Sequence, residues 1–287
     1  MRYACLIITY TSAKQTKRII DKLGNGDFDF YIHLDKKVNI NTHRDLFNLP
    51  NVYFIKNRIK VNWAGFTIVQ ASFNGIKEIV ASGREYAFIN LMSGQDYPVK
   101  SADYISDFLS KQVGNQLINT LNFENWTEAK SRITKFHLTD IVFKGKYIIE
   151  KLVNNIYRHR STPKWLKFYG SNSTFWTLSP ECAMYVVNAV ESNINLYYFY
   201  KYTWGSDEFV FQTMIMNSHF MPQVVNNNYR YTDWSGGGAH PKTLRVEDFH
   251  QIMNSEAIFG RKFNRIIDPL ILDMIDEANI NYEAWHT

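Results

Sequence analysis

The N-terminal third of the chain alternates short apolar runs with helical segments, and this alternation constrains the fold more than any other feature. Tyr3–Thr9 and Phe28–Leu34 have the composition of buried strands, and the segment between them, 13–23, has helical spacing and ends at the turn Gly24-Asn25-Gly26. The alternation continues with a strand at 52–55, a helix at 68–82 and a strand at 86–91. Strands joined by helices predict an α/β sheet covered by helices, with ligands bound at the strand ends.

The second half of the chain predicts further elements of the same kind. We expect strands at 117–121 and 175–178, and helices at 143–157, 180–190, 207–217, 246–254 and 270–278. The basic loop 158–164 is the predicted internal boundary or flexible flap. A length of 287 residues with 45% hydrophobic content supports a single large domain.

Cysteine usage and charge limit the setting and the partners. Cys5 and Cys182 lie far apart in apolar runs, which predicts buried free thiols in a reducing compartment. No cleavage site and no apolar stretch long enough for an anchor is visible, so we expect a cytoplasmic protein. The net charge of +5 favours anionic partners. We expect no nucleic acid among them, because the chain has no lysine/arginine block and no zinc-finger spacing.

The segment Trp204-Gly205-Ser206-Asp207-Glu208 places an acidic pair between a glycine turn and an apolar helix start. Taken alone, the pattern is typical of an ordinary helix start, with Ser206 as the cap and two carboxylates in the first turn. The basic run Pro241-Lys242-Thr243-Leu244-Arg245 follows downstream. Together the two segments suggest a general base near a phosphate-binding site.

Several segments, in order along nearly the whole chain, resemble one enzyme family. They are Val61-Asn62-Trp63-Ala64-Gly65-Phe66, Ile89 to Pro98 with its Ser-Gly-Gln-Asp-Tyr-Pro run, Tyr169-Gly170-Ser171, Ser206-Asp207-Glu208 and Arg261-Lys262-Phe263. The chain is similar in these segments to the core-2/I-branching β-1,6-N-acetylglucosaminyltransferases and their peptide O-xylosyltransferase relatives. The resemblance implies a GT-A-type (Rossmann-like) mixed sheet flanked by helices. It implies one domain, with an N-terminal nucleotide-binding half, about 1–115, and an acceptor and catalytic half, about 116–287. It also implies inverting transfer of a sugar, GlcNAc favoured and xylose possible, from a UDP-sugar to an acceptor hydroxyl.

The resemblance assigns the acidic pair and the basic residues to roles. Glu208 matches the catalytic glutamate, kept ionised by the helix dipole, and Asp207 takes a capping or positioning role. Relatives of this kind replace a metal with basic side chains, so no metal or other cofactor is expected. Lys262, with Lys242 or Arg245, is the expected diphosphate partner. Asp27-Phe28-Asp29 has the spacing of a metal-binding motif, but we interpret it as a turn with solvated acids.

The remaining site predictions concern the base and the acceptor. Asp35 matches an aspartate near the uracil or ribose, with a strand-end turn residue as the alternative. Trp234 matches a tryptophan that stacks on the acceptor sugar, with a core residue as the alternative. Glu124 and Arg132 fall in a segment that supplies acceptor contacts in relatives, and of the two we predict a contact for Glu124. We expect Asp96 to support its loop.

No anchor, stem or set of disulfide cysteines like those of the animal relatives is visible in the sequence, so we expect a bacterial-type cytosolic member. This implies a glycan or lipid-linked glycan acceptor in surface polysaccharide or glycoconjugate synthesis. The basic loop 158–164 suggests peripheral contact with the anionic inner face of the plasma membrane. Two other classes stay open: a non-catalytic nucleotide- or glycan-binding protein of the same fold, and a basic, aromatic nucleic-acid-binding protein.

Overall fold

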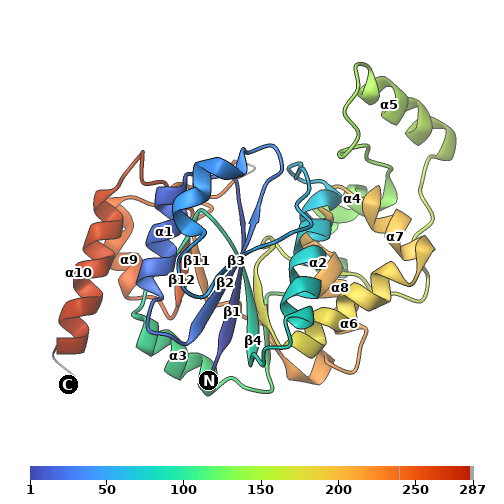
Figure 1. The fold of residues 1–287 in the computed structure, drawn as a ribbon. Helices are drawn as coiled ribbons and strands as arrows, with labels where there is room; N and C mark the ends of the chain where they lie inside the picture. Colours follow the sequence, from blue (N-terminus) through green and yellow to red (C-terminus); the bar gives the residue numbers. More distant parts are fainter. Residues whose placement is uncertain (239, 285–287) are drawn as a thin grey trace.

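The protein is an α/β structure in which a mixed sheet lies between two groups of helices, as predicted (Figure 1). The computed structural model describes residues 1–238 and 240–284. The main sheet has seven strands in the order β10-β6-β9-β4-β1-β2-β3. Its strands are β1 (Tyr3–Thr9), β2 (Phe28–Leu34), β3 (Val52–Phe54), β4 (Phe88–Ser93), β6 (Gln116–Ile118), β9 (Trp176–Leu178) and β10 (Val224–Val225).

The centre of the sheet is parallel, and one strand reverses its direction. β1 pairs in parallel with β2 on one side and with β4 on the other. β9 runs antiparallel between β4 and β6. The burial of β1 and β2 on both faces explains why their sequences are almost continuously apolar. Smaller sheets join β11 (Arg230–Thr232), β12 (Phe259–Arg261) and β5 (Asp96–Pro98), and β7 (Leu121–Asn122) with β8 (Tyr169–Gly170).

The helices cover both faces of the sheet, so the molecule has a hydrophobic core on each side (Figure 1). One face carries α2 (Phe66–Ala81), α6 (Pro180–Glu191) and α8 (Val210–Met216), which pack on one another, with α7 (Ile194–Lys201) beside them. The other face carries α1 (Ala13–Lys22), α3 (Ala102–Ser110), α9 (Phe249–Met253) and α10 (Leu270–Ala284). The short α4 (Lys130–Thr134) and the helix α5 (Lys146–Tyr157) lie in the insertion between β7 and β8.

Most of the predicted elements are present, with one informative difference. The predicted helix 207–217 is divided into the 3₁₀ turn η4 (Ser206–Glu208) and α8, because the chain turns at Phe209. Ser206 is wrong as a helix cap: its side chain is buried and its Oγ has no hydrogen-bond partner. Cys5 and Cys182 are buried free thiols, as predicted. Within the described residues no helix has both the length and the apolar character needed to cross a bilayer.

Two charged segments differ from the prediction. Asp29 is not solvated, because it is fully buried at the start of β2, where it pairs with Arg2 and accepts a hydrogen bond from the Tyr86 hydroxyl at 2.5 Å. The basic loop 158–164 is not a detached flap, because one of its residues is anchored to the body of the protein. The buried Arg160 donates to the backbone carbonyl of Tyr202 at 2.7 Å, which fixes the loop to the end of α7.

Candidate functional site

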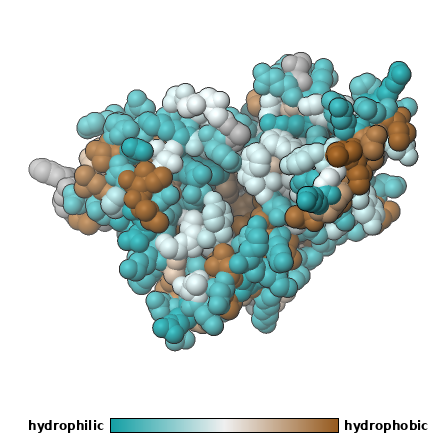
Figure 2. Space-filling view, turned by 90° about the horizontal axis from the view of Figure 1, so that it is seen from above, coloured by the Kyte–Doolittle hydropathy of each residue, from teal (hydrophilic) through white to brown (hydrophobic). Residues whose placement is uncertain are grey.

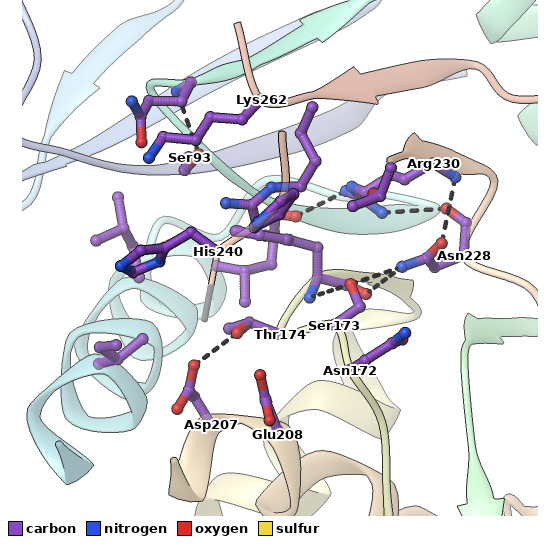
Figure 3. Close-up of a pocket in the computed structure, with 18 of the residues that line it drawn as sticks. Ser93, Asn172, Ser173, Thr174, Asp207, Glu208, Asn228, Arg230, His240 and Lys262 are labelled. Carbon is purple, nitrogen blue, oxygen red and sulfur yellow. Dashed lines mark hydrogen bonds between the residues drawn. The ribbon is translucent and has the colours of Figure 1, made fainter. Parts of the chain in front are cut away.

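A cavity of about 370 Å³ opens at the carboxyl ends of the parallel strands, where ligands bind in α/β sheets. Asp207 and Glu208 line one side, and Ser93, at the end of β4, and Lys262 line another (Figure 3). The space-filling view from above shows the hollow in the middle of the molecule (Figure 2). The cavity therefore joins the Ser-Gly-Gln-Asp, Asp-Glu and Lys-Phe segments, which lie far apart in the sequence.

Hydrogen bonds to two other parts of the chain hold the backbone around Glu208. Gly205 has the left-handed φ of 64° that turns the chain into η4, and its amide donates to the carbonyl of Ala64 at 2.8 Å. The amide of Ser171 donates to the carbonyl of Glu208 at 3.0 Å. The side chain is fixed as well, since its Oε2 accepts a hydrogen bond of 2.6 Å from Nη1 of Arg132. Glu208 is thus a rigidly placed carboxylate at the cavity wall.

The pKa of Glu208 is raised to about 7. Burial is the main cause, because it disfavours the charged carboxylate, and the neighbouring Asp207 raises the pKa further. Arg132 acts in the opposite direction. Burial therefore opposes the helix-dipole effect that was expected to keep Glu208 ionised. A carboxyl with a pKa near neutrality is suited to accept a proton in one step and release it in the next.

Asp207 points toward Thr174, whose hydroxyl donates to Oδ2 of Asp207 at 2.6 Å (Figure 3). The side chain is buried, and burial raises its pKa. Thr174 and Asp207 together fix the start of the turn that carries Glu208. The positioning role of Asp207 stays a prediction, and this hydrogen bond is the contact through which it would act.

Three cationic side chains line the cavity: Arg230, Arg261 and Lys262. The guanidinium of Arg230 donates a hydrogen bond to the carbonyl of Leu91 at 2.7 Å. Burial lowers the pKa of Arg230 to about 10. Nε of Arg261 lies 3.5 Å from Oδ1 of Asp96, so Arg261 is partly buried and forms an ion pair.

Among the side chains that the structure describes, no carboxylate lies within 4.0 Å of the Lys262 ammonium group. Burial and the charge of Arg261 lower its pKa. A bound anion would stabilise the charged form of this ammonium group, because it would offset both the burial and the repulsion from Arg261. Lys262 is the cavity cation best suited to bind a phosphate.

The other predicted nucleotide contacts lie outside the cavity lining. Nζ of Lys242 is 2.7 Å from Oδ1 of Asp248 and 3.8 Å from Oδ2 of Asp233, so its charge is already paired. Arg245 is exposed, and only its backbone takes part in the following turn. Asp35 is buried at the end of β2, where its carboxylate accepts from the amide of Lys37 at 2.8 Å. The segment before Lys242 contributes His240 and Pro241 to the cavity instead.

A second cavity of about 210 Å³ adjoins the first and shares Asp207 and Glu208 with it. Four tryptophans line it: Trp63, Trp126, Trp204 and Trp234. Trp234 is therefore at a cavity surface and not in the core. The guanidinium of Arg132 lies 4.5 Å from the ring centre of Trp204 and 5.1 Å from that of Trp126. Tryptophan faces suit the C–H side of a pyranose ring.

Glu124 lines neither cavity; it is exposed in the short turn η2 (Phe123–Asn125). Arg132, from the same region, contacts Glu208 directly. The sequence signal for Trp204 was its position next to Gly205 in the acidic motif. Nothing in the sequence predicts that Trp126 and Arg230 belong to the site, because only the folding of the chain brings them to the cavities.

The described residues contain no group of three or more histidine, cysteine, aspartate or glutamate side chains placed to hold a metal ion. The carboxylates of Asp207 and Glu208 face Thr174 and Arg132 instead. Beside this carboxylate pair and the three cations described above, neutral polar side chains such as Asn172 and Asn228 line the larger cavity.

Comparison with known proteins identifies the family of the chain. The family model for the core-2/I-branching enzymes matches residues 3–256. The chain belongs to this family. The family indicated by the sequence motifs is thereby confirmed, and the α/β mixed sheet agrees with the architecture that the resemblance implied.

The curated relatives of this core-2/I-branching family member are distant and longer. The chain is 24% identical to xylosyltransferase 2 of Rattus norvegicus and of Homo sapiens, over 96% of its own length, and 21% identical to a xylosyltransferase of Ciona intestinalis, over 94%. It spans about a third of the length of these relatives (33%). A solved structure of the galactosyltransferase LgtC with donor and acceptor sugar analogues aligns over 92% of this chain and 87% of that one, at 10% identity and a TM-score of 0.42.

Proposed function

We propose that the protein is an inverting glycosyltransferase that moves a sugar from a UDP-sugar to an acceptor hydroxyl. The observation that carries this proposal is the position of Glu208 in the wall shared by two cavities. The larger cavity has the cations that a diphosphate requires, and the smaller has the aromatic rings that a sugar acceptor requires. A base at their junction can reach an acceptor hydroxyl that faces the donor.

The proposed reaction is a single displacement at the anomeric carbon of the donor. The acceptor oxygen forms a bond to that carbon while its proton passes to the carboxylate of Glu208. The bond from the anomeric carbon to the diphosphate oxygen breaks, and UDP leaves with the bonding electron pair. Glu208 then returns the proton to solvent. Arg132 orients the carboxylate, and Asp207 with Thr174 holds the turn that carries it.

We propose that Lys262, together with Arg261 and Arg230, stabilises the negative charge that develops on the departing diphosphate. Support comes from their common location in the larger cavity and from the family resemblance, in which basic side chains take the place of a metal. Binding of UDP in the presence and absence of EDTA, measured by calorimetry, tests this point. Affinity that is unchanged by EDTA supports the metal-free arrangement, and affinity lost with EDTA contradicts it.

The donor is proposed to be UDP-GlcNAc or UDP-xylose. The resemblance to branching enzymes favours UDP-GlcNAc. UDP-xylose is the second candidate, because the curated relatives are named xylosyltransferases. The acceptor is proposed to be a glycan, free or lipid-linked, that belongs to a surface polysaccharide or glycoconjugate. A panel of UDP-sugars titrated by calorimetry identifies the donor as the one that binds most tightly.

The decisive experiment replaces Glu208 with Gln, which keeps the shape of the side chain and removes the base. We expect sugar transfer to fall by at least about a hundredfold while the affinity for UDP stays within about twofold. The matched control is Lys111→Gln, on the surface end of α3. UDP binding without transfer by the unmodified protein, for every donor and acceptor tried, favours the alternative of a non-catalytic nucleotide- or glycan-binding protein.

A further inference from the structure

The helix α5 is amphipathic, but its polar side faces the protein and its apolar side faces outward. Glu150 accepts a hydrogen bond from the amide of Leu138 at 2.8 Å. The side chain of Asn154 bonds both the amide of Phe136, at 2.8 Å, and its carbonyl, at 2.9 Å. No residue of α5 is buried. Helices on globular proteins normally bury their apolar stripe, so the reversed orientation requires an explanation.

The outward side of α5 and the segment before it form an exposed apolar surface, which we name the α5 patch. Its members are large hydrophobic side chains: Val142, Phe143, Tyr147, Ile148, Leu152 and Ile156. Val142 is 84% exposed and Ile156 is 75% exposed. Figure 2 shows hydrophobic colour gathered over the side of the molecule where Figure 1 draws α5. A contiguous apolar patch of this kind marks an interaction surface.

Basic residues are frequent in the part of the chain that carries the α5 patch. Between residues 141 and 167 the exposed or half-buried ones are Lys144, Lys146, Lys151, Arg158, Lys164 and Lys167. The same stretch holds one acidic residue, Glu150, which is bonded to the backbone. An apolar stripe with lysine and arginine at its borders is the pattern of helices that lie in the interface of an anionic bilayer.

We propose that α5 inserts its apolar side into the surface of a bilayer that contains anionic phospholipids. The lysines contact the lipid phosphates, and the α5 patch enters the boundary between headgroups and acyl chains. A second copy of this chain is a poor occupant, because a contact through α5 would bring two clusters of like charge together. The inference goes beyond the basic loop 158–164, since it assigns insertion to the helix and not only attraction to the loop.

The position of α5 suits this orientation. β1 begins near the N-terminus, and α5 stands at the opposite end of the molecule, toward which the strand runs (Figure 1). The larger cavity lies at the carboxyl ends of the same strands, and the smaller cavity adjoins it. A bilayer bound by α5 therefore lies on the side of the molecule from which a lipid-linked substrate would approach. Insertion itself does not depend on the proposed transfer, so Glu208→Gln is expected to bind vesicles like the unmodified protein.

The test measures partition of the full chain onto vesicles of phosphatidylcholine, with and without phosphatidylglycerol. We expect binding only when phosphatidylglycerol is present. Leu152→Glu with Ile156→Glu should lower the partition coefficient by about a hundredfold or more, because two large apolar side chains no longer enter the lipid. Neutralising Lys144, Lys151 and Lys164 to Gln should lower it by about fivefold for each lysine. All five positions are exposed, so the melting temperature of each variant should equal that of the unmodified protein.

Ile266→Glu is the matched control for the apolar variants, because Ile266 is 83% exposed and lies before α10, on the other side of the molecule. Lys111→Gln is the control for charge. Both should bind as well as the unmodified protein. Equal losses in the control and α5 variants, or no binding to phosphatidylglycerol vesicles at all, overturn the proposal. Self-association that the α5 variants abolish assigns the patch to a second copy and overturns it equally.

A fluorescent label separates insertion from adsorption by charge. Cys5 and Cys182 are buried, so a cysteine introduced at residue 156 can be labelled selectively with an environment-sensitive dye. We expect its emission to shift to the blue on phosphatidylglycerol vesicles, and no shift for a dye placed at residue 266. Vesicle binding without a shift at residue 156 shows that the contact is electrostatic only and contradicts insertion.

Discussion

At the scale of single residues, the pKa of Glu208 predicts how transfer depends on pH. The base must be ionised, so kcat/KM should rise with pH and level off above about 7. Arg132 lowers this pKa, and Arg132→Gln should therefore move the rise to higher pH as well as lowering the maximum. The measurement is kcat/KM against pH for both proteins. A rise centred near pH 4.5, the ordinary value of a glutamate, would contradict the assignment of Glu208 as the base.

The charges around the larger cavity predict which lysine binds the diphosphate. Lys262→Ala should weaken UDP binding by about ten- to a hundredfold, because it removes a charge-assisted contact with a phosphate. Lys242→Ala should change the affinity by less than about threefold, since Lys242 is already paired with Asp248. Calorimetric titration of UDP against both variants makes the comparison. A larger loss for Lys242→Ala would show that this segment rearranges when the nucleotide binds.

Sequence reasoning found the residues of this site that lie in short motifs and missed those that the fold brings in. Glu208 and Lys262 could be predicted because each lies in a motif that the chain shares with its family. Lys242 and Arg245 have the right charge, but nothing in the sequence shows that Asp248 already neutralises one and that the other faces solvent. Arg132 lies far from Glu208 in the sequence, so their contact could be known only from the structure.

At the scale of elements, α2 begins without a cap of its own and takes one from a distant segment. Gly65 precedes the helix and has no side chain to offer, and Asp140 accepts from the amide and the hydroxyl of Thr67, at 3.2 Å and 2.7 Å. Asp140→Ala should therefore cost about 1 kcal/mol of stability. Urea denaturation of the variant and the unmodified protein measures the loss, and an unchanged free energy of unfolding would contradict the capping role.

Gly65 and Asp140 should be coupled. A Cβ on Gly65 would lie 2.0 Å from Oδ1 of Asp140, so Gly65→Ala must displace the cap. We expect Gly65→Ala to cost less when Asp140 is already Ala than when it is present, by about 0.5 kcal/mol or more. Gly236→Ala is the control, because among the described residues no atom beyond its chain neighbours lies within 4 Å of the added Cβ. Strict additivity of the two substitutions would show that they do not compete for the same space.

The elements also show what periodicity can and cannot predict. The helical spacing of 143–157 correctly indicated an amphipathic helix, and α5 begins three residues later. Periodicity does not state which side of a helix meets the body of the protein, and in α5 the polar side does so through Glu150 and Asn154. The alternation in the N-terminal third was more informative, because continuous apolar runs require strands buried on both faces.

At the scale of the whole molecule, the two halves of the chain share one sheet. The N-terminal half supplies β1 to β4, and the C-terminal half supplies β6, β9 and β10, with Leu178 of β9 opposite Ile89 of β4. Without the other half, β4 and β9 would each lose a hydrogen-bonded neighbour and expose a strand edge. The strand order therefore predicts that the chain unfolds as a single unit, although the sequence divides into a nucleotide-binding part and an acceptor part.

Scanning calorimetry tests this cooperativity. We expect one transition whose calorimetric and van't Hoff enthalpies agree. Leu178→Ala, at a fully buried position on the shared border, should cost about 2 to 5 kcal/mol and lower the whole transition by roughly 5 to 15 °C without dividing it. If the halves were independent domains, only one of two transitions would move. Because Asp207 and Glu208 lie in the C-terminal half and Ser93 in the N-terminal half, loss of this border would also separate the two sides of the larger cavity. UDP binding should therefore disappear at the same temperature as the sheet.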